Sequence, residues 1–178
     1  LKTIWTKDVS DDKAISYESV NPAKEGKYIN YYSPIIAGSD SIIAIKTSLS
    51  SIPEFVLITP SEKTEKTIHK PGQMYPWFIS YANGKIIWVE TKYDPRWENR
   101  EYSVIKQLDI NTGIIRVLSQ KSRYLSASVS PDGKIIAAIE NTISNKNNLV
   151  FIDALEGSVR ETVSAPGNIY LQRPQWSE

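Results

Sequence analysis

The stretch SVSPDGKIIAAIE, residues 128–140, joins a turn phrase to an apolar run and decides the fold. Pro131 presets its backbone φ, Asp132 can accept a bond from the backbone two residues on, and Gly133 tolerates positive φ. The apolar run 135–139 is too short for an ordinary helix and is typical of a buried strand. Asp132 could also belong to a binding loop, but the whole phrase is better interpreted as the corner of a β-hairpin.

The same corner recurs twice earlier in the chain. NGK at 83–85 precedes IIWV, and GSDS at 38–41 precedes IIAI. A second hairpin follows each corner, with strands predicted at 54–59, 102–110 and 149–153 that lead through polar turns into another strand. Gly84 and Gly133 lie 49 positions apart, and Asp109 and Asp153, each ending a third strand, lie 44 apart.

A period of 40–50 residues with four strands per unit is typical of β-propeller blades. We therefore expect an all-β fold of four-stranded antiparallel blades, with full blades at about 28–70, 74–119 and 123–164. Residues 1–26 are interpreted as part of a preceding blade and 169–178 as the first strand of a following blade. A β-sandwich or barrel is the alternative, which the regular alternation of turn types disfavours but the period does not exclude.

Composition excludes several classes of protein. Lys and Arg number 21 against 20 Asp and Glu, so the chain lacks the basic footprint of a nucleic-acid binder or a membrane-surface protein. No apolar run approaches the roughly 18 residues needed to span a bilayer. There is no cysteine, which excludes disulfides, thiol nucleophiles and zinc–thiolate sites. We predict no nucleic-acid partner, no membrane insertion and no cofactor.

One blade carries a recognisable set of phrases: SPDGKIIA at 130–137, FID at 151–153 and EG at 156–157, followed by RPQWS at 173–177. These resemble the TolB-like propeller repeat, also found in the propellers of prolyl oligopeptidases and the tricorn protease. The earlier copies, SYANGK at 80–85 and IAGSDS at 36–41, are degraded. The resemblance covers about 28–178 and implies a fold rather than an activity. It also implies a periplasmic or secreted location.

A complete propeller of this kind would have about six or more blades, so we expect this chain to be a piece of a larger protein. The chain begins at Leu1 rather than Met and stops where the turn of a fourth blade would begin. A partial ring leaves two apolar blade faces uncovered. We therefore expect self-association through those faces, or dependence on the missing blades.

Catalytic and metal sites are not expected. His69 is the only histidine, no Gly-x-Ser-x-Gly elbow exists, and His69 is interpreted as a surface residue. The acidic cluster Asp8, Asp11 and Asp12 and the stretch DINTG at 109–113 resemble calcium loops superficially, but the cluster lacks the glycine and terminal glutamate of such a loop. The cluster is interpreted as a solvated loop, and DINTG as a turn between strands.

The loop YDPRWENRE, residues 93–101, is the strongest candidate for partner contact. It lengthens the second-to-third-strand loop of the middle blade, and in a propeller such loops share one face with the connections between blades. Trp, Tyr and Arg are enriched in interface hot spots, and long loops are often functional. The predicted partner-binding residues are Tyr93, Arg96, Trp97 and Arg100 in the loop, and Arg123 and Tyr124 in the connection.

Two alternatives accompany that prediction. Trp97 could fold back over its own blade, leaving the loop charges solvated. Tyr124 also has a core interpretation, since Tyr75, Trp77, Trp88 and Tyr124 lie within or beside strands and are expected to pack between blades.

Two functions remain open. The first is a non-enzymatic scaffold that binds a protein or peptide on its loop-rich face, within a larger bacterial envelope or secreted protein. The second is the substrate-gating propeller portion of a serine peptidase whose catalytic domain is absent from this chain. The reading frame beyond Glu178 discriminates them: a hydrolase elbow followed by Asp and His favours the second, and further blades ending in a stop codon favour the first.

Overall fold

The computed structural model describes residues 19–20, 28–74, 78–97, 101–120 and 122–177. Most of the predicted preceding blade at 1–26, with its three aspartates, lies outside the described residues, as do Tyr75, Trp77 and Arg100. The described residues contain no helix long and apolar enough to cross a bilayer.

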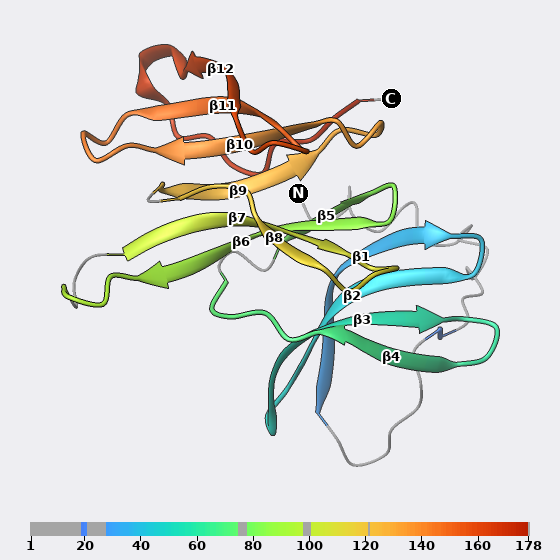
Figure 1. The fold of residues 1–178 in the computed structure, drawn as a ribbon. Coiled ribbons are helices and arrows are strands. Elements are labelled where there is room, and N and C mark those ends of the chain that lie inside the picture. Colours follow the sequence, from blue (N-terminus) through green and yellow to red (C-terminus); the bar gives the residue numbers. More distant parts are fainter. Residues whose placement is uncertain (1–18, 21–27, 75–77, 98–100, 121, 178) are drawn as a thin grey trace, which may run out of the picture.

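The described chain forms three four-stranded antiparallel sheets, which confirms the expected all-β class (Figure 1). Each sheet is one blade, numbered here in chain order. Blade 1 contains β1 (Ile29–Gly38), β2 (Ser41–Ser48), β3 (Ser51–Thr59) and β4 (Thr64–His69). Blade 2 contains β5 (Ile79–Ala82), β6 (Lys85–Tyr93), β7 (Glu101–Asp109) and β8 (Ile115–Val117). Blade 3 contains β9 (Tyr124–Val129), β10 (Ile135–Asn141), β11 (Asn147–Asp153) and β12 (Val159–Ser164), followed by the short 3₁₀ helix Pro166–Asn168.

The phrase SPDGK forms the corner between β9 and β10, as predicted. Ser130 Oγ donates to Asp132 Oδ1 at 2.6 Å, and the Lys134 backbone N–H donates to the same oxygen at 3.1 Å. Gly133 has φ +72°, which its missing Cβ permits. The neighbouring corner touches this one, since Asn83 Nδ2 donates to the Asp132 carbonyl at 2.9 Å. The aspartate therefore serves the turn, and corners of adjacent blades are joined.

Asp109 and Asp153 end equivalent third strands with the same turn. Asp109 Oδ1 accepts the backbone N–H groups of Asn111 and Thr112, each at 3.0 Å. Asp153 Oδ1 accepts those of the residues at 155 and 156, each at 2.8 Å. These bonds lower the pKa of both carboxyls, with Arg160 contributing first at Asp153. The DINTG stretch is therefore a turn, as expected, and its carboxylate is already occupied.

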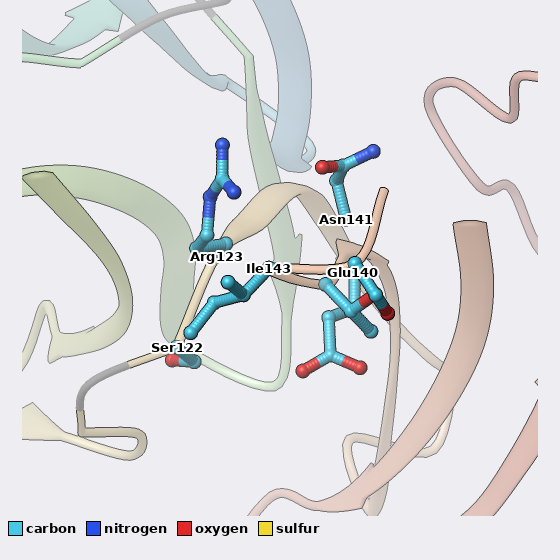
Figure 2. A pocket seen from close by; sticks show the side chains of 7 residues that line it. Ser122, Arg123, Glu140, Asn141 and Ile143 are labelled. Atoms are coloured by element: carbon cyan, nitrogen blue, oxygen red, sulfur yellow. The ribbon is translucent and has the colours of Figure 1, made fainter. Parts of the chain in front are cut away.

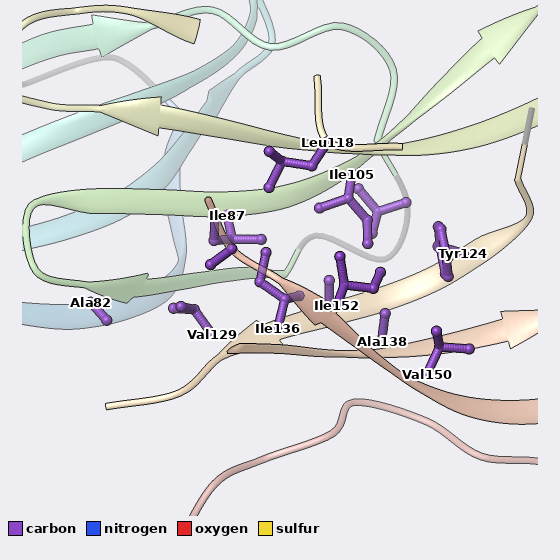
Figure 3. Packing of buried hydrophobic residues seen from close by; sticks show 13 residues of the cluster. Ala82, Ile87, Ile105, Leu118, Tyr124, Val129, Ile136, Ala138, Val150 and Ile152 are labelled. Carbon is purple, nitrogen blue, oxygen red and sulfur yellow. The ribbon is translucent and has the colours of Figure 1, made fainter. Parts of the chain in front are cut away.

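Two layers of the core lie between adjacent blades, and a smaller third cluster (Ala44, Val56 and Ile58) lies in blade 1. Between blades 1 and 2, Trp88 is fully buried and packs edge-on against Phe55, with ring centroids 5.2 Å apart. Between blades 2 and 3, Ile87 and Ile105 face Ile136 (Figure 3). Two-sided burial explains why the second strands are almost continuously apolar.

Residues 169–177 differ from the expectation of an innermost strand, because the structure assigns no strand there. The segment still lies against blade 3: Trp176 Nε1 donates to the Ser128 carbonyl at 3.0 Å, and its ring lies 6.1 Å from Phe151. A strand requires a backbone partner along its length, and no described strand pairs with this segment. The segment lies over the side of blade 3 where Ala137 and Ile139 are buried, so this expected open face is partly closed.

Candidate functional site

The loops and connections that carry the predicted partner-binding residues lie at one end of the blades. The second-to-third-strand loops (49–50, 94–97 and 142–146) and the connections between blades (70–74 and 118–123, position 121 aside) lie at the same end of the strands (Figure 1). We call this end the loop face. The hairpin corners and the third-to-fourth-strand turns lie at the opposite end.

Two equivalent junctions occur on the loop face, where a connection meets the end of a second strand. In the first junction the Thr91 N–H donates to the Gln73 carbonyl at 2.7 Å. In the second junction the Asn141 N–H donates to the Arg123 carbonyl at 3.0 Å. Gln73 and Arg123 therefore hold the same place in successive blades.

The first junction is closed by its own side chains. The Glu90 carboxylate accepts bonds from Gly72 N–H and Trp88 Nε1, each at 3.1 Å, and pairs with Lys106. Burial raises the pKa of Glu90, but the bonds from Lys106, Trp88 and Gly72 outweigh it and the net shift is downward. The Tyr93 hydroxyl completes the junction by donating to the side chain of Gln73.

The second junction is open. Its residues surround a hollow of about 470 Å³ lined by Ser122, Arg123, Glu140, Asn141, Thr142, Ile143 and Ser144 (Figure 2). The Arg123 side chain is exposed, and the Glu140 carboxylate accepts one long bond, 3.4 Å from Asn148 Nδ2. In Figure 2 the Arg123 guanidinium and the Glu140 carboxylate point in opposite directions. The arrangement can offer a ligand one positive and one negative group.

The predicted partner-binding residues of the β6–β7 loop that the structure describes are all exposed or half exposed. Trp97 is 64% exposed, so it does not fold back over its blade. Tyr93 is half exposed and donates from its hydroxyl to Gln73 Oε1 at 2.6 Å. Arg96 is exposed beside Trp97, in a turn where its N–H donates to Asp94 Oδ1 at 2.9 Å.

The connection residues behave differently from each other. Arg123 is on the surface of the second junction. Tyr124 is only 5% exposed and belongs to the core between blades 2 and 3, which corrects its assignment to a partner-binding surface. Burial, and then the nearby Glu140 carboxylate, raise the pKa of Tyr124 to about 12. Its strand position turns the ring inward, so its core interpretation is the one that holds.

A second hollow of about 410 Å³ lies beside the β6–β7 loop, lined in part by Tyr93, Pro95 and Tyr102. In the part of the chain that the structure describes, no group of three or more His, Asp or Glu side chains is arranged to hold a metal ion.

His69 is more enclosed than the surface residue that the sequence suggested. Its ring lies 5.8 Å from Phe55 and 5.5 Å from Trp88, between the two aromatic side chains that join blades 1 and 2. Burial lowers the pKa of His69, and the opposing effect of Glu90 is smaller.

This environment makes stability depend on pH. Because the folded-state pKa of His69 lies below its unfolded value of about 6.5, the unfolded chain binds more protons as pH falls from about 7. We expect the free energy of unfolding, from urea titrations, to decrease between pH 7 and pH 5 and to be flat from pH 7 to 8. His69→Phe, which keeps an aromatic ring, should remove most of that decrease. An equal decrease in both proteins would contradict the assignment.

Three residues on the loop face escaped the sequence interpretation. Leu49 and Ile143 are 88% and 85% exposed at the tips of their loops, and Glu140 faces the open junction. Aligning the second strands KIIWVE and IIAAIE would have revealed the shared glutamate, but choosing that register requires knowing which side each residue faces.

No protein-family model and no curated protein matches this chain. It is similar to the β-propeller domain of the Trilobed protease from Pyrococcus furiosus, with 13% identity and a TM-score of 0.57 over 78% of this chain and 44% of that one. It is also similar to a puromycin-hydrolyzing peptidase of Mycobacterium tuberculosis, with 11% identity and a TM-score of 0.53 over 74% of this chain and 20% of that one. The chain thus spans less than half the length of either. At these identities the likeness shows the fold alone: the three sheets are β-propeller blades.

Proposed function

We propose that this chain is the ligand-binding part of a non-enzymatic β-propeller scaffold, which takes a protein or peptide partner on its loop face. One observation carries the proposal. Each blade places one large apolar side chain at the tip of its second-to-third-strand loop: Leu49, Trp97 and Ile143, which are 88%, 64% and 85% exposed. Single exposed apolar residues are ordinary, but one in the corresponding loop of three successive blades supports a shared contact surface.

The charges of the loop face suit a partner with carboxylates. Among the described residues, the exposed cations there are Lys70, which pairs with Glu54, and Lys92, Arg96, Arg123 and Lys146, whereas the exposed acid is Glu101. Complementary charge speeds encounter and selects partners, while aromatic and arginine anchors supply much of the affinity. A peptide with apolar and acidic side chains is therefore the partner class we favour.

A selection from a phage-displayed library of random dodecapeptides tests this proposal. We expect enriched peptides to combine apolar and acidic residues. The best of them, made as a synthetic peptide, should bind about thirtyfold more weakly to a Trp97→Ser/Ile143→Ser variant, because each of the two lost anchors costs about 1 kcal/mol or more. The measurement is a calorimetric titration.

The matched control is Ile114→Ser/Leu155→Ser, which removes two apolar side chains, 60% and 66% exposed, from the turns at the opposite end. It should leave the affinity unchanged. A library that yields no binder, or a binder that the control pair weakens and the loop-face pair does not, would overturn the proposal.

The alternative function is the substrate-gating propeller of a serine peptidase. It is favoured by one observation: the two similar solved structures are a protease propeller domain and a peptidase. Sequencing the parent reading frame past Glu178 decides between the two. A Gly-x-Ser-x-Gly elbow followed by Asp and His supports the peptidase, and further blades ending in a stop codon support the scaffold.

A further inference from the structure

We propose that the second junction binds a short peptide through both of its charges, with Glu140 taking a primary ammonium group and Arg123 taking a carboxylate. This rests on the proposed function and gives it a specific pocket and ligand chemistry. The proposal comes from comparing the second junction with the first, which the same fold builds one blade earlier.

The strand registers establish which residues correspond. In blade 2, Lys85 pairs with Asp109, and in blade 3, Ile135 pairs with Asp153, the two aspartates that end third strands. Five positions along each second strand come Glu90 and Glu140. The residue after each glutamate gives the same alignment. Thr91 N–H donates to the Gln73 carbonyl, and Asn141 N–H donates to the Arg123 carbonyl. Glu90 and Glu140 therefore occupy the same place.

Their neighbours differ in a way that leaves Glu140 short of donors. The residues equivalent to Trp88 and Lys106 are Ala138 and Val150, which carry neither an N–H donor nor an ammonium group. Both are buried in the apolar layer between blades 2 and 3. Among the described residues, Glu140 keeps the bond from Asn148, which at 3.4 Å is long for an N–H···O bond. A ligand ammonium would supply what Lys106 supplies to Glu90.

The second charge arises by a matching replacement. Arg123 occupies the position that Gln73 has in the connection between blades 1 and 2. Ile143 occupies the position of Tyr93, whose hydroxyl donates to Gln73 in the first junction. The internal bond is therefore replaced by a guanidinium and an apolar side chain. Among the described residues no carboxylate forms an ion pair with Arg123. A guanidinium in such a place is suited to bind a carboxylate through two parallel hydrogen bonds.

The pocket is both roomy and fixed in shape. Its volume of about 470 Å³ lies within the usual range for small-ligand sites. Backbone bonds hold its walls, from Ser103 N–H to the Ser122 carbonyl at 2.9 Å and from Thr142 N–H to the Lys146 carbonyl at 2.9 Å. Walls that are ordered before binding lower the entropic cost of association.

The test uses tri-alanine with free ends as the probe, together with its N-acetyl and C-amide forms, in calorimetric titrations. We expect tri-alanine to bind, and loss of either charge to weaken binding about tenfold to a hundredfold, as charge-assisted hydrogen bonds of this kind predict. N-acetyl-Lys-Ala-Ala distinguishes the two sources of ammonium: recovered affinity assigns a lysine side chain, and no recovery assigns the chain terminus.

Two conservative variants connect each charge to its residue. Glu140→Gln should weaken tri-alanine about as much as N-acetylation does, and Arg123→Gln, which restores the residue of the first junction, about as much as C-amidation does. Glu156→Gln, an exposed carboxylate in a turn at the opposite end, is the control and should change nothing. Thermal unfolding of each variant verifies that the fold is kept.

The possible results separate this inference from the proposed function. If Glu140→Gln and Arg123→Gln bind tri-alanine as the parent does, or the parent does not bind it, the inference is wrong. The proposed function survives that result when a selected dodecapeptide still loses affinity in the Trp97→Ser/Ile143→Ser variant. It fails when no peptide binds the loop face.

Discussion

Replacing Trp88 with alanine is expected to lower the free energy of unfolding by about 3–5 kcal/mol, the usual cost of truncating a buried tryptophan. Trp88 is fully buried between blades 1 and 2 and packs edge-on against Phe55. Its Nε1 also donates to Glu90, so truncation leaves that carboxylate with one bond fewer. The loss leaves a cavity in the cluster between the two blades, which also contains Ile43, Ile45 and Leu108.

Trp97→Ala is the matched control, because it removes the same side chain from a 64% exposed position in the same blade. Its effect on stability should stay within about 0.5 kcal/mol. Urea unfolding followed by circular dichroism measures both. If Trp88→Ala does not fold, Trp88→Phe keeps a ring but loses the donor and should cost about 1–3 kcal/mol. Equal effects at positions 88 and 97 would contradict the inter-blade packing.

Gly157→Ala is expected to destabilise the fold by about 2–5 kcal/mol, from two separate causes. Gly157 has φ +77°, a conformation in which any Cβ is strained. A Cβ there would also lie 2.4 Å from the Leu118 carbonyl oxygen, which belongs to the backbone of the preceding blade and cannot rotate away. Blades 2 and 3 would have to move apart.

Gly113 separates the two causes, because substitution there introduces the first without the second. It holds the equivalent place in the turn of blade 2, with φ +72°, and a Cβ there meets nothing within 4 Å. Gly113→Ala should therefore cost only the backbone strain, about 1–2 kcal/mol. Thermal and urea unfolding of the two variants give the comparison. Equal losses would mean that the contact between the blade 3 turn and Leu118 is not made.

Turn chemistry explains why the architecture could be predicted. Asp132 and Asp109 each bond to backbone groups within three residues, and a glycine follows each in its turn. Their roles therefore follow from local sequence. The same holds for the short apolar runs of the second strands, which are buried on both sides. These signals are local and repeat with the blade.

The open junction could not be predicted in that way. The open state of Glu140 depends on Ala138 and Val150, which pair with each other across β10 and β11. It also depends on the register between blades 2 and 3, which differs by one residue from the alignment of their Gly-Lys corners. The inward turn of Tyr124 depends in the same way on the blade it faces. Likewise, 169–177 has strand-like composition, but pairing depends on a partner that its own residues do not specify.

The central claim is that a peptide binds at the loop face, and amide hydrogen exchange with and without the selected dodecapeptide tests it most directly. We predict slower exchange at 96–97, 122–123 and 140–144 when the peptide is bound, with no change in the turns at 110–113 and 154–157. Protection confined to those turns, with exchange across the loop face unaltered, would contradict the claim.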